Sequence, residues 1–199
     1  IHNIGLREVA RIEGEIDAIL RRLGRTQGTV KARIEQLEKD QSYPLTEDGR
    51  AQIMRDIEGF IADAQRRSQS LFDKTPKAPV IARPFPRFRE NNAAANYNGP
   101  SRDGSRPGIF QIPLRPSNMT KFGLRTLVYH ETVPGHHFQI ALELENTATP
   151  RFRQIRALGG ISAFSEGWGL YAERLAAENG WYEGDPEGQR SEEHTSELQ

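Results

Sequence analysis

The sequence has no cysteine among its 199 residues. Disulfide bonds and thiolate metal ligands are therefore excluded, and the redox state of the protein's compartment stays open. No apolar run approaches the roughly 18 residues that a bilayer-spanning helix needs, so we predict no membrane-spanning segment. The chain begins at Ile1 rather than Met, and it carries no information about an export leader.

An excess of charge of one sign is also missing. The chain has 27 Lys and Arg residues against 27 Asp and Glu residues. This balance predicts neither a nucleic-acid partner nor binding to an anionic membrane surface. Hydrophobic residues make up only 36% of the chain, which favours long helices with wide solvated faces or a piece of a larger protein.

The last ten residues, RSEEHTSELQ, resemble the translation of a sequencing adapter. We interpret residues 190–199 as read-through and residues 1–189 as a fragment of one domain, open at both ends.

Apolar residues that recur every three or four positions predict several helices. In the last of them, Phe164, Trp168, Tyr171 and Leu175 share one face. The predicted helical segments cover residues 6–23, 30–37, 46–71, 120–131, 136–144 and 162–180.

Two short segments favour strands, residues 79–83 and residues 108–114. Proline cannot donate to a strand ladder, so Pro113 makes the second segment an edge strand by prediction. The expected fold is mainly α-helical, with a small edge-strand region just before the histidines.

Three of the five histidines lie in one segment, YHETVPGHHFQ (residues 129–139). In the zinc motif H-E-x-x-H the two histidines lie one helical turn apart and bind one ion, and the glutamate is the general base. Here His130 and Glu131 begin the motif, but Pro134 replaces its second histidine. Six residues rotate a straight helix by about 240°, so His136 would face away from His130.

A break in the helix resolves this conflict. Pro134 lacks an amide donor and clashes with the carbonyl four residues earlier, and Gly135 permits the unusual backbone of a bulge. We expect a two-residue bulge that brings His136 beside His130 as a metal ligand, with Glu131 as general base for a metal-bound water. The alternative is a polar helix end with three solvated histidines.

A catalytic zinc ion needs a third protein ligand. Glu143 and Glu145 are near in sequence but lie further along the same helix. Glu166 opens an apolar helix 30 residues after His136, and we prefer it, although a glutamate in a first helical turn ordinarily complements the helix dipole. Further candidates for holding a ligand in place or binding substrate are His137, Gln139, Glu173, Tyr171 and Tyr129.

Four segments carry a resemblance to a known family: IHNIGLREVARIEGEI, DGSRPGIFQI, YHETVPGHHFQ and FSEGWGLYAERLAAENGWYEGDP. The chain resembles the bacterial domain of unknown function 885, a family related to thimet-oligopeptidase-like zinc peptidases. The resemblance implies a helical metallopeptidase-like bundle with a deep cleft, and it favours an exported or periplasmic location. It also implies that His130, His136 and Glu166 bind one zinc ion, Zn²⁺, and that Glu131 activates water.

The same resemblance implies that the predicted edge strand runs antiparallel to a bound peptide, through main-chain hydrogen bonds. The strand residues concerned are Ile109, Phe110, Gln111 and Ile112.

The leading hypothesis is therefore a zinc-dependent hydrolase that cleaves peptide bonds. A non-haem iron oxygenase also uses two histidines and a carboxylate, but such sites normally lie on β-barrels, and this chain lacks the many strands required. A third hypothesis is a non-catalytic metal-binding or interaction module, or an inactive fragment. Glu131 argues against it, because a purely structural site has no use for a base beside its ligand. No pattern indicates the oligomeric state.

Overall fold

The structure, a computed structural model, describes residues 2–115, 119–154, 161–185 and 188. The predicted mainly α-helical fold is confirmed, and the proposed read-through at 190–199 lies outside the described residues. The helices are α1 (His2–Arg22), α2 (Val30–Gln41), α3 (Glu47–Leu71), α4 (Arg87–Glu90), α5 (Lys121–Glu131), α6 (His136–Glu145), α7 (Arg151–Gln154) and α8 (Ser162–Glu178). The strands are β1 (Val80–Pro84), β2 (Asn96–Asn98) and β3 (Gly108–Ile112).

Threonines fix the starts of three helices. The side chains of Thr29, Thr46 and Thr120 each accept a hydrogen bond, at 3.1–3.2 Å, from the amide three residues further on. Such a cap satisfies a backbone donor that the first helical turn leaves open, and it contributes about 1 kcal/mol. The predicted starts of α2 and α3 are therefore confirmed.

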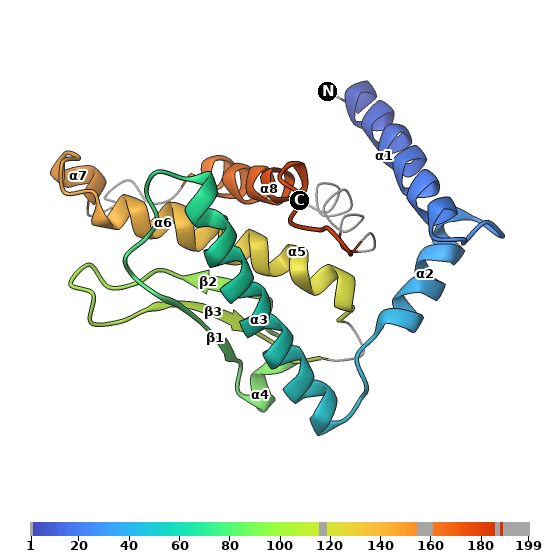
Figure 1. Cartoon of the computed structure of the whole chain (residues 1–199), viewed down its shortest axis with the longest axis horizontal. Helices are drawn as coiled ribbons and strands as arrows, with labels where there is room; N and C mark the ends of the chain where they lie inside the picture. Colours follow the sequence, from blue (N-terminus) through green and yellow to red (C-terminus); the bar gives the residue numbers. More distant parts are fainter. Residues whose placement is uncertain (1, 116–118, 155–160, 186–187, 189–199) are drawn as a thin grey trace.

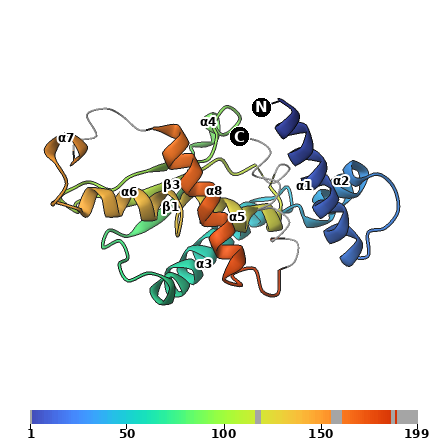
Figure 2. The ribbon, with the colours of Figure 1, turned by 90° about the horizontal axis from the view of Figure 1, so that it is seen from above.

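Helices α1 and α2 lie together at one end of the molecule (Figures 1 and 2). They share a small apolar cluster that reaches the first turn of α5. The predicted apolar stripe of α1 is buried only in its second half, since Leu6 and Val9 are exposed. The buried members of the cluster are Ile12, Ile16, Leu20, Leu37 and Phe122.

The strands form one three-stranded sheet in the order β1–β3–β2. Strand β3 pairs parallel with β1 on one side and antiparallel with β2 on the other. The edge-strand prediction is therefore wrong, because β3 is the central strand. Pro113 does not prevent this, since β3 ends at Ile112 and the missing amide lies beyond the ladder.

The correction also concerns the predicted substrate strand. Ile109, Phe110 and Gln111 each face a partner on both sides, and Ile112 pairs with Pro84. A strand paired on both sides has no free ladder of amides and carbonyls, so Ile109, Phe110 and Gln111 cannot add a peptide strand.

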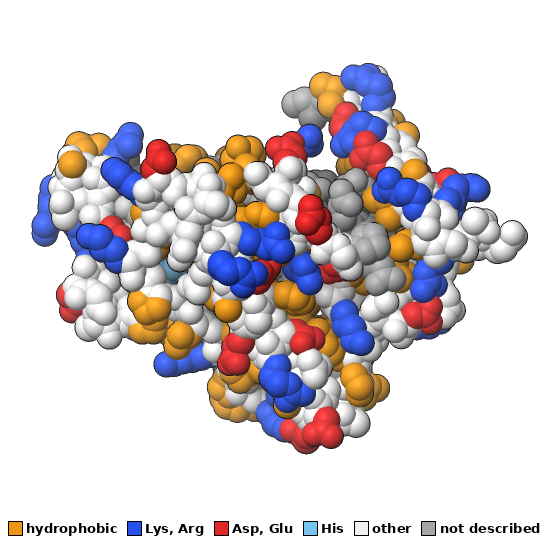
Figure 3. All heavy atoms as spheres, viewed as in Figure 1, with side chains coloured by type: hydrophobic (Ala, Val, Ile, Leu, Met, Phe, Trp, Pro, Cys, Tyr) orange, Lys and Arg blue, Asp and Glu red, His pale blue; other side chains and the backbone are white. Residues whose placement is uncertain are grey.

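The main apolar core lies between α3, the sheet, α5 and α8, with α5 beside both α3 and α8 (Figure 1). None of the described helices combines the length and the apolar composition that a bilayer crossing requires. On the face shown in Figure 3, basic and acidic side chains of the described residues are interspersed. Fully buried core members include Ile53, Ile57, Phe110, Val128 and Tyr129.

The buried face of α8 differs from the predicted one. Phe164 and Tyr171 of the aromatic stripe are 66% and 50% exposed, whereas Gly169, Ala172 and Ala176 are buried. Helix α8 packs against α5 through these small residues, which let two helix backbones approach closely. Hydrophobic periodicity identifies large apolar side chains, and it therefore missed the small residues of the buried side, although Trp168 of the predicted stripe does pack against the main core.

Candidate metal centre

The helix that carries the histidines is broken as predicted. Helix α5 ends at Glu131 and α6 begins at His136. Across the break the amide of Gly135 donates to the carbonyl of Tyr129, at 3.0 Å, and the amide of Phe138 donates to that of Thr132, at 3.2 Å. Each bond spans six residues, where an α-helical bond spans four. The break thus absorbs two extra residues, the predicted size of the bulge.

The predicted unusual backbone is present at Gly135, whose φ of −78° and ψ of −131° belong to neither the helical nor the strand region. A Cβ atom built on Gly135 would also overlap the carbonyl oxygens of His130 and Tyr129. Only glycine allows the chain to pass this close to the end of α5.

The structure brings together the three predicted metal ligands. Atoms of His130, His136 and Glu166 that can bind a metal all lie within 4.8 Å of one another. One carboxylate oxygen, Oε2 of Glu166, lies 3.3 Å from Nε2 of His130 and 3.5 Å from Nε2 of His136. The imidazole rings are edge to face, with centroids 4.6 Å apart.

The two distances from Oε2 of Glu166 fit a shared zinc ion. Ligand atoms at about 2.1 Å from a tetrahedral ion are about 3.4 Å from each other. Two neutral imidazoles and one carboxylate also form the donor set of catalytic zinc sites, which leave a fourth position open. Glu166 is the solvent-exposed member, with a side chain 44% exposed, whereas both histidines are buried.

Glu173 orients the first histidine. Its Oε1 lies 2.6 Å from Nδ1 of His130, and both side chains are almost fully buried. A carboxylate accepts a hydrogen bond from Nδ1–H and leaves the Nε2 lone pair facing Glu166 and His136. The predicted role of Glu173, to hold a histidine, agrees with this geometry.

Three carboxylates, those of Glu131, Glu166 and Glu173, act on the imidazole of His130. Burial disfavours the charged form of His130, but the hydrogen bond and the charge of Glu173 outweigh it and raise the pKa of His130. Burial, followed by the charge of His130, lowers the pKa of His136. The excess of acidic groups over bases favours a bound cation at this place.

Glu131, the predicted general base, is 7% exposed and lies at the last residue of α5. Burial is the main reason why its pKa is raised, to about 7, and the nearby Glu166 adds to the effect. A carboxylate with a pKa near neutrality is suited to accept and then return a proton.

His137 lies outside this ligand set. Its Nδ1 is 2.8 Å from the hydroxyl of Tyr97, and its Nε2 is 3.1 Å from the carbonyl of Ala78. The carbonyl only accepts, so Nε2 carries the proton and Nδ1 accepts from the tyrosine. Burial lowers the pKa of His137 to about 4 and keeps the ring neutral. This histidine ties α6 to the sheet instead of orienting a ligand.

Of the remaining predicted residues, Tyr129 is bound outside the ligand set. The hydroxyl of the buried Tyr129 donates to the carbonyl of Trp181, at 3.3 Å, and burial raises its pKa to about 12. Tyr171 is half-exposed and packs its ring near Trp168. Among the described residues, the buried side-chain amide of Gln139 has no hydrogen-bond partner.

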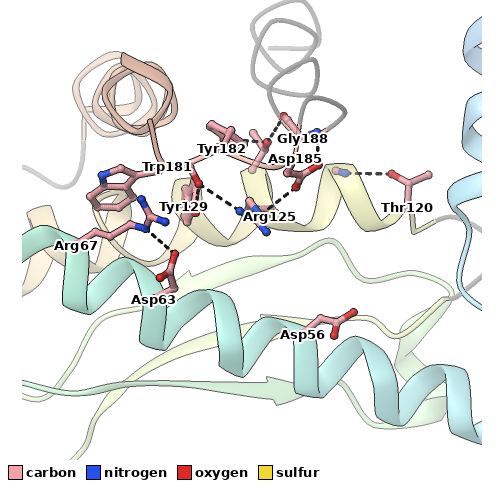
Figure 4. Close-up of polar contacts among 12 residues, drawn as sticks. Asp56, Asp63, Arg67, Thr120, Arg125, Tyr129, Trp181, Tyr182, Asp185 and Gly188 are labelled. Carbon is pink, nitrogen blue, oxygen red and sulfur yellow. Dashed lines mark hydrogen bonds and ion pairs between the residues drawn. The ribbon is translucent and has the colours of Figure 1, made fainter. Parts of the chain in front are cut away.

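The turn after α8 holds that helix against α5 and α3 (Figure 4). Arg125 of α5 forms an ion pair with Asp185, at 3.1 Å, and donates to the carbonyl of Trp181, at 3.2 Å. Arg67 of α3 lies 3.5 Å from the carbonyl of Gly180, in the same turn. Because α8 carries Glu166 and Glu173, these contacts help to fix both carboxylates relative to the histidines.

The sequence did not predict that two further residues, Trp168 and Gly169, contact the site. Trp168 donates its indole N–H to carbonyls of the helix break, and Gly169 lies against the ring of His130. The signal that was available is their position in SEGWG, directly after the predicted ligand Glu166.

Comparisons with known proteins give one family model and solved structures of similar chains. The family model described as "Bacterial protein of unknown function (DUF885)" matches residues 1–195. A crystal structure of "the putative lipoprotein" from Colwellia psychrerythraea is 40% identical, with a TM-score of 0.92 over 98% of this chain and 34% of the other. A "putative lipoprotein of unknown function" from Shewanella oneidensis is 20% identical, with a TM-score of 0.71 over 98% of this chain and 37% of the other.

The chain thus spans about a third of the length of these two solved structures. The Shewanella protein, at 20% identity, shows a shared fold alone. No curated protein matches the sequence.

Proposed function

The chain belongs to the DUF885 family of bacterial proteins, and we propose that its histidine–glutamate centre binds one zinc ion and hydrolyses peptide bonds. The observation that carries the proposal is the convergence of His130, His136 and Glu166 on one point, beside the buried carboxylate of Glu131. A relation to zinc peptidases with a glutamate as third ligand is part of the proposal.

Three residues would bind the ion, and a fourth would orient one of them. Nε2 of His130, Nε2 of His136 and a carboxylate oxygen of Glu166 would bind it, and Glu173 would keep His130 in the required tautomer. When bound, zinc lowers the pKa of water to about 7 and polarises carbonyl groups.

Glu131 supplies the acid–base chemistry. As a carboxylate it accepts a proton from the attacking water, and as a carboxylic acid it gives that proton to the leaving amine. Its burial favours the protonated form enough for Glu131 both to accept and to donate a proton near neutral pH. A general base of this kind contributes about 10²–10⁴-fold to a rate.

Two observations distinguish this proposal from its rivals. The described strands form a single three-stranded sheet, not the barrel on which iron oxygenases with such ligands normally lie. The described site also has Glu131 beside its ligands, which a structural metal site does not require. An exported location is also proposed, and the words "putative lipoprotein" used for both solved relatives support it.

The test compares Glu131→Gln with the wild type. Metal analysis should find about one zinc ion per chain in both, because glutamine keeps the shape of the side chain and no ligand is lost. The rate of peptide hydrolysis, measured by mass spectrometry of the peptide products, should fall at least about 100-fold. Glu178→Gln, at an exposed position of α8, is the control and should keep full activity. Unchanged turnover in Glu131→Gln would refute the mechanism.

A further inference from the structure

Trp168 joins the helix of the third ligand to the break between the two histidines. Its indole nitrogen Nε1 lies 2.8 Å from the carbonyl oxygen of Pro134 and 3.2 Å from that of Gly135. We propose that Trp168 is a positioning residue, which sets the separation of His130 and His136 by fixing this break. The inference rests on the proposed function, because the separation matters for a shared metal ion.

The break needs a donor from outside its own helix. In a continuous helix the amide of Phe138 would donate to the carbonyl of Pro134. Here that amide donates to Thr132 instead, at 3.2 Å. Pro134 is buried, and a buried carbonyl without a donor costs about 1–3 kcal/mol. The indole of Trp168 provides the donor that the bulge removes.

Within the described residues, no side chain caps the N-terminus of α6. Gly135 is its cap residue, and no side-chain capping hydrogen bond is present there. The carbonyl of Gly135 receives the amide of Gln139, at 3.1 Å, in addition to the indole. Trp168 therefore contacts the break one residue before His136, where a small backbone shift would move that imidazole.

The position of Trp168 in α8 connects this contact to the other parts of the centre. Glu166 lies two residues earlier and faces both histidines. Gly169 is the next residue and abuts the ring of His130, and Glu173 binds its Nδ1. Residues 166–173 of α8 thus contact each side of the break, and Trp168 is the member that holds its backbone.

The chemistry of tryptophan suits this role. The indole N–H is a donor only, so it does not compete with the imidazoles for a metal ion or accept their protons. The ring lies near Tyr171, with centroids 5.8 Å apart. A phenylalanine would fill most of the same space but would leave the carbonyl of Pro134 without its donor.

The experiment compares Trp168→Phe with Trp181→Phe, which removes the same atoms from the second of the two tryptophans in the chain. Trp181 is buried in the turn after α8, and it accepts hydrogen bonds from Arg125 and Tyr129 at its backbone carbonyl, which phenylalanine keeps. Zinc affinity is measured by competition with a chromophoric chelator, and the visible spectrum of the Co²⁺ form reports the coordination geometry. In metal-free protein, nuclear Overhauser effects between the rings of His130 and His136 report their separation.

We expect Trp168→Phe to weaken zinc binding about 10- to 100-fold, to change the Co²⁺ spectrum and to weaken the Overhauser effect between the rings. Trp181→Phe should lower the urea midpoint while zinc affinity stays within about twofold. As a second variant, 3-benzothienylalanine at position 168 keeps the ring shape and replaces N–H by sulfur. It should reproduce the loss of affinity even if phenylalanine disturbs packing.

Wild-type zinc affinity and an unchanged Overhauser effect in both position-168 variants would overturn the inference and leave the proposed function intact. A wild-type chain that binds no zinc would overturn the proposed function. In that case the Overhauser measurement alone would decide whether Trp168 sets the separation of the histidines.

Discussion

Gly169 lies directly against the imidazole of His130. A Cβ atom built on Gly169 would stand 2.5 Å from Cε1 and 2.8 Å from Nε2 of that ring. The ring is held by the hydrogen bond from Nδ1 to Glu173 and packs edge to face with the ring of His136, so it has little freedom to move aside. The absence of a side chain at Gly169 is therefore a condition for the observed geometry.

Gly169→Ala should displace the ring of His130 and weaken zinc binding at least about tenfold, the lower end of what outer-shell changes cost. Gly167→Ala is a matched control on the same helix, because its Cβ would meet nothing within 4 Å. Both changes gain up to about 1 kcal/mol of helix propensity, so the difference between them isolates the contact with His130. Equal zinc affinities in the two variants, by chelator competition, would contradict this prediction.

Tyr97→Phe should lower the free energy of unfolding by about 1–3 kcal/mol, because the buried Nδ1 of His137 loses its donor. Zinc affinity should stay within about twofold, since His137 is not a ligand. Tyr171→Phe removes a hydroxyl from a half-exposed ring and should change stability by less than about 0.5 kcal/mol. Urea titrations give both values. A loss of zinc binding in Tyr97→Phe would place His137 in the metal centre after all.

Arg50→Met should destabilise the protein by about 3–5 kcal/mol. Arg50 binds both oxygens of the buried Glu90, at 2.7 and 2.9 Å, and donates to the carbonyl of Leu114. Removing the guanidinium leaves a buried carboxylate without its partner. Arg87→Met is the control: it opens an exposed ion pair with Glu47 and should cost less than about 1 kcal/mol.

The same pair predicts the pH dependence of stability. The hydrogen bond from Arg50 outweighs burial and lowers the pKa of Glu90 below its ordinary value of 4.5. A carboxyl group with a lowered folded-state pKa contributes its stability above the unfolded pKa and loses it as the pH falls through the folded pKa. The difference between wild type and Arg50→Met in urea should therefore shrink between pH 7 and pH 3. A constant difference would show that the ion pair contributes little.

Local sequence signals were sufficient where the cause is local. Thr29 and Thr46 mark helix starts because a hydroxyl caps the amide three residues later. Pro134 and Gly135 indicated the break, because one lacks an amide and the other lacks a side chain. From these two residues alone, the approach of His136 to His130 was predictable.

Contacts between distant segments were not predictable in this way. The central place of β3 depends on β2, whose residues Asn96–Asn98 are polar and give no strand pattern. His137 finds its partner Tyr97 at a separation of 40 residues. The buried side of α8 follows from how closely it approaches α5, a property of the pair and not of either helix. Each of these errors concerns which segment lies next to which.

The six-residue hydrogen bonds across the break have a consequence for how related centres are recognised. Sequence patterns that require two histidines at one fixed spacing do not match this protein, although the bulge between His130 and His136 absorbs the two extra residues. Geometric criteria, such as distances of about 3.4 Å between a histidine nitrogen and a carboxylate oxygen, would group it with metal centres whose ligands have a different spacing in the sequence.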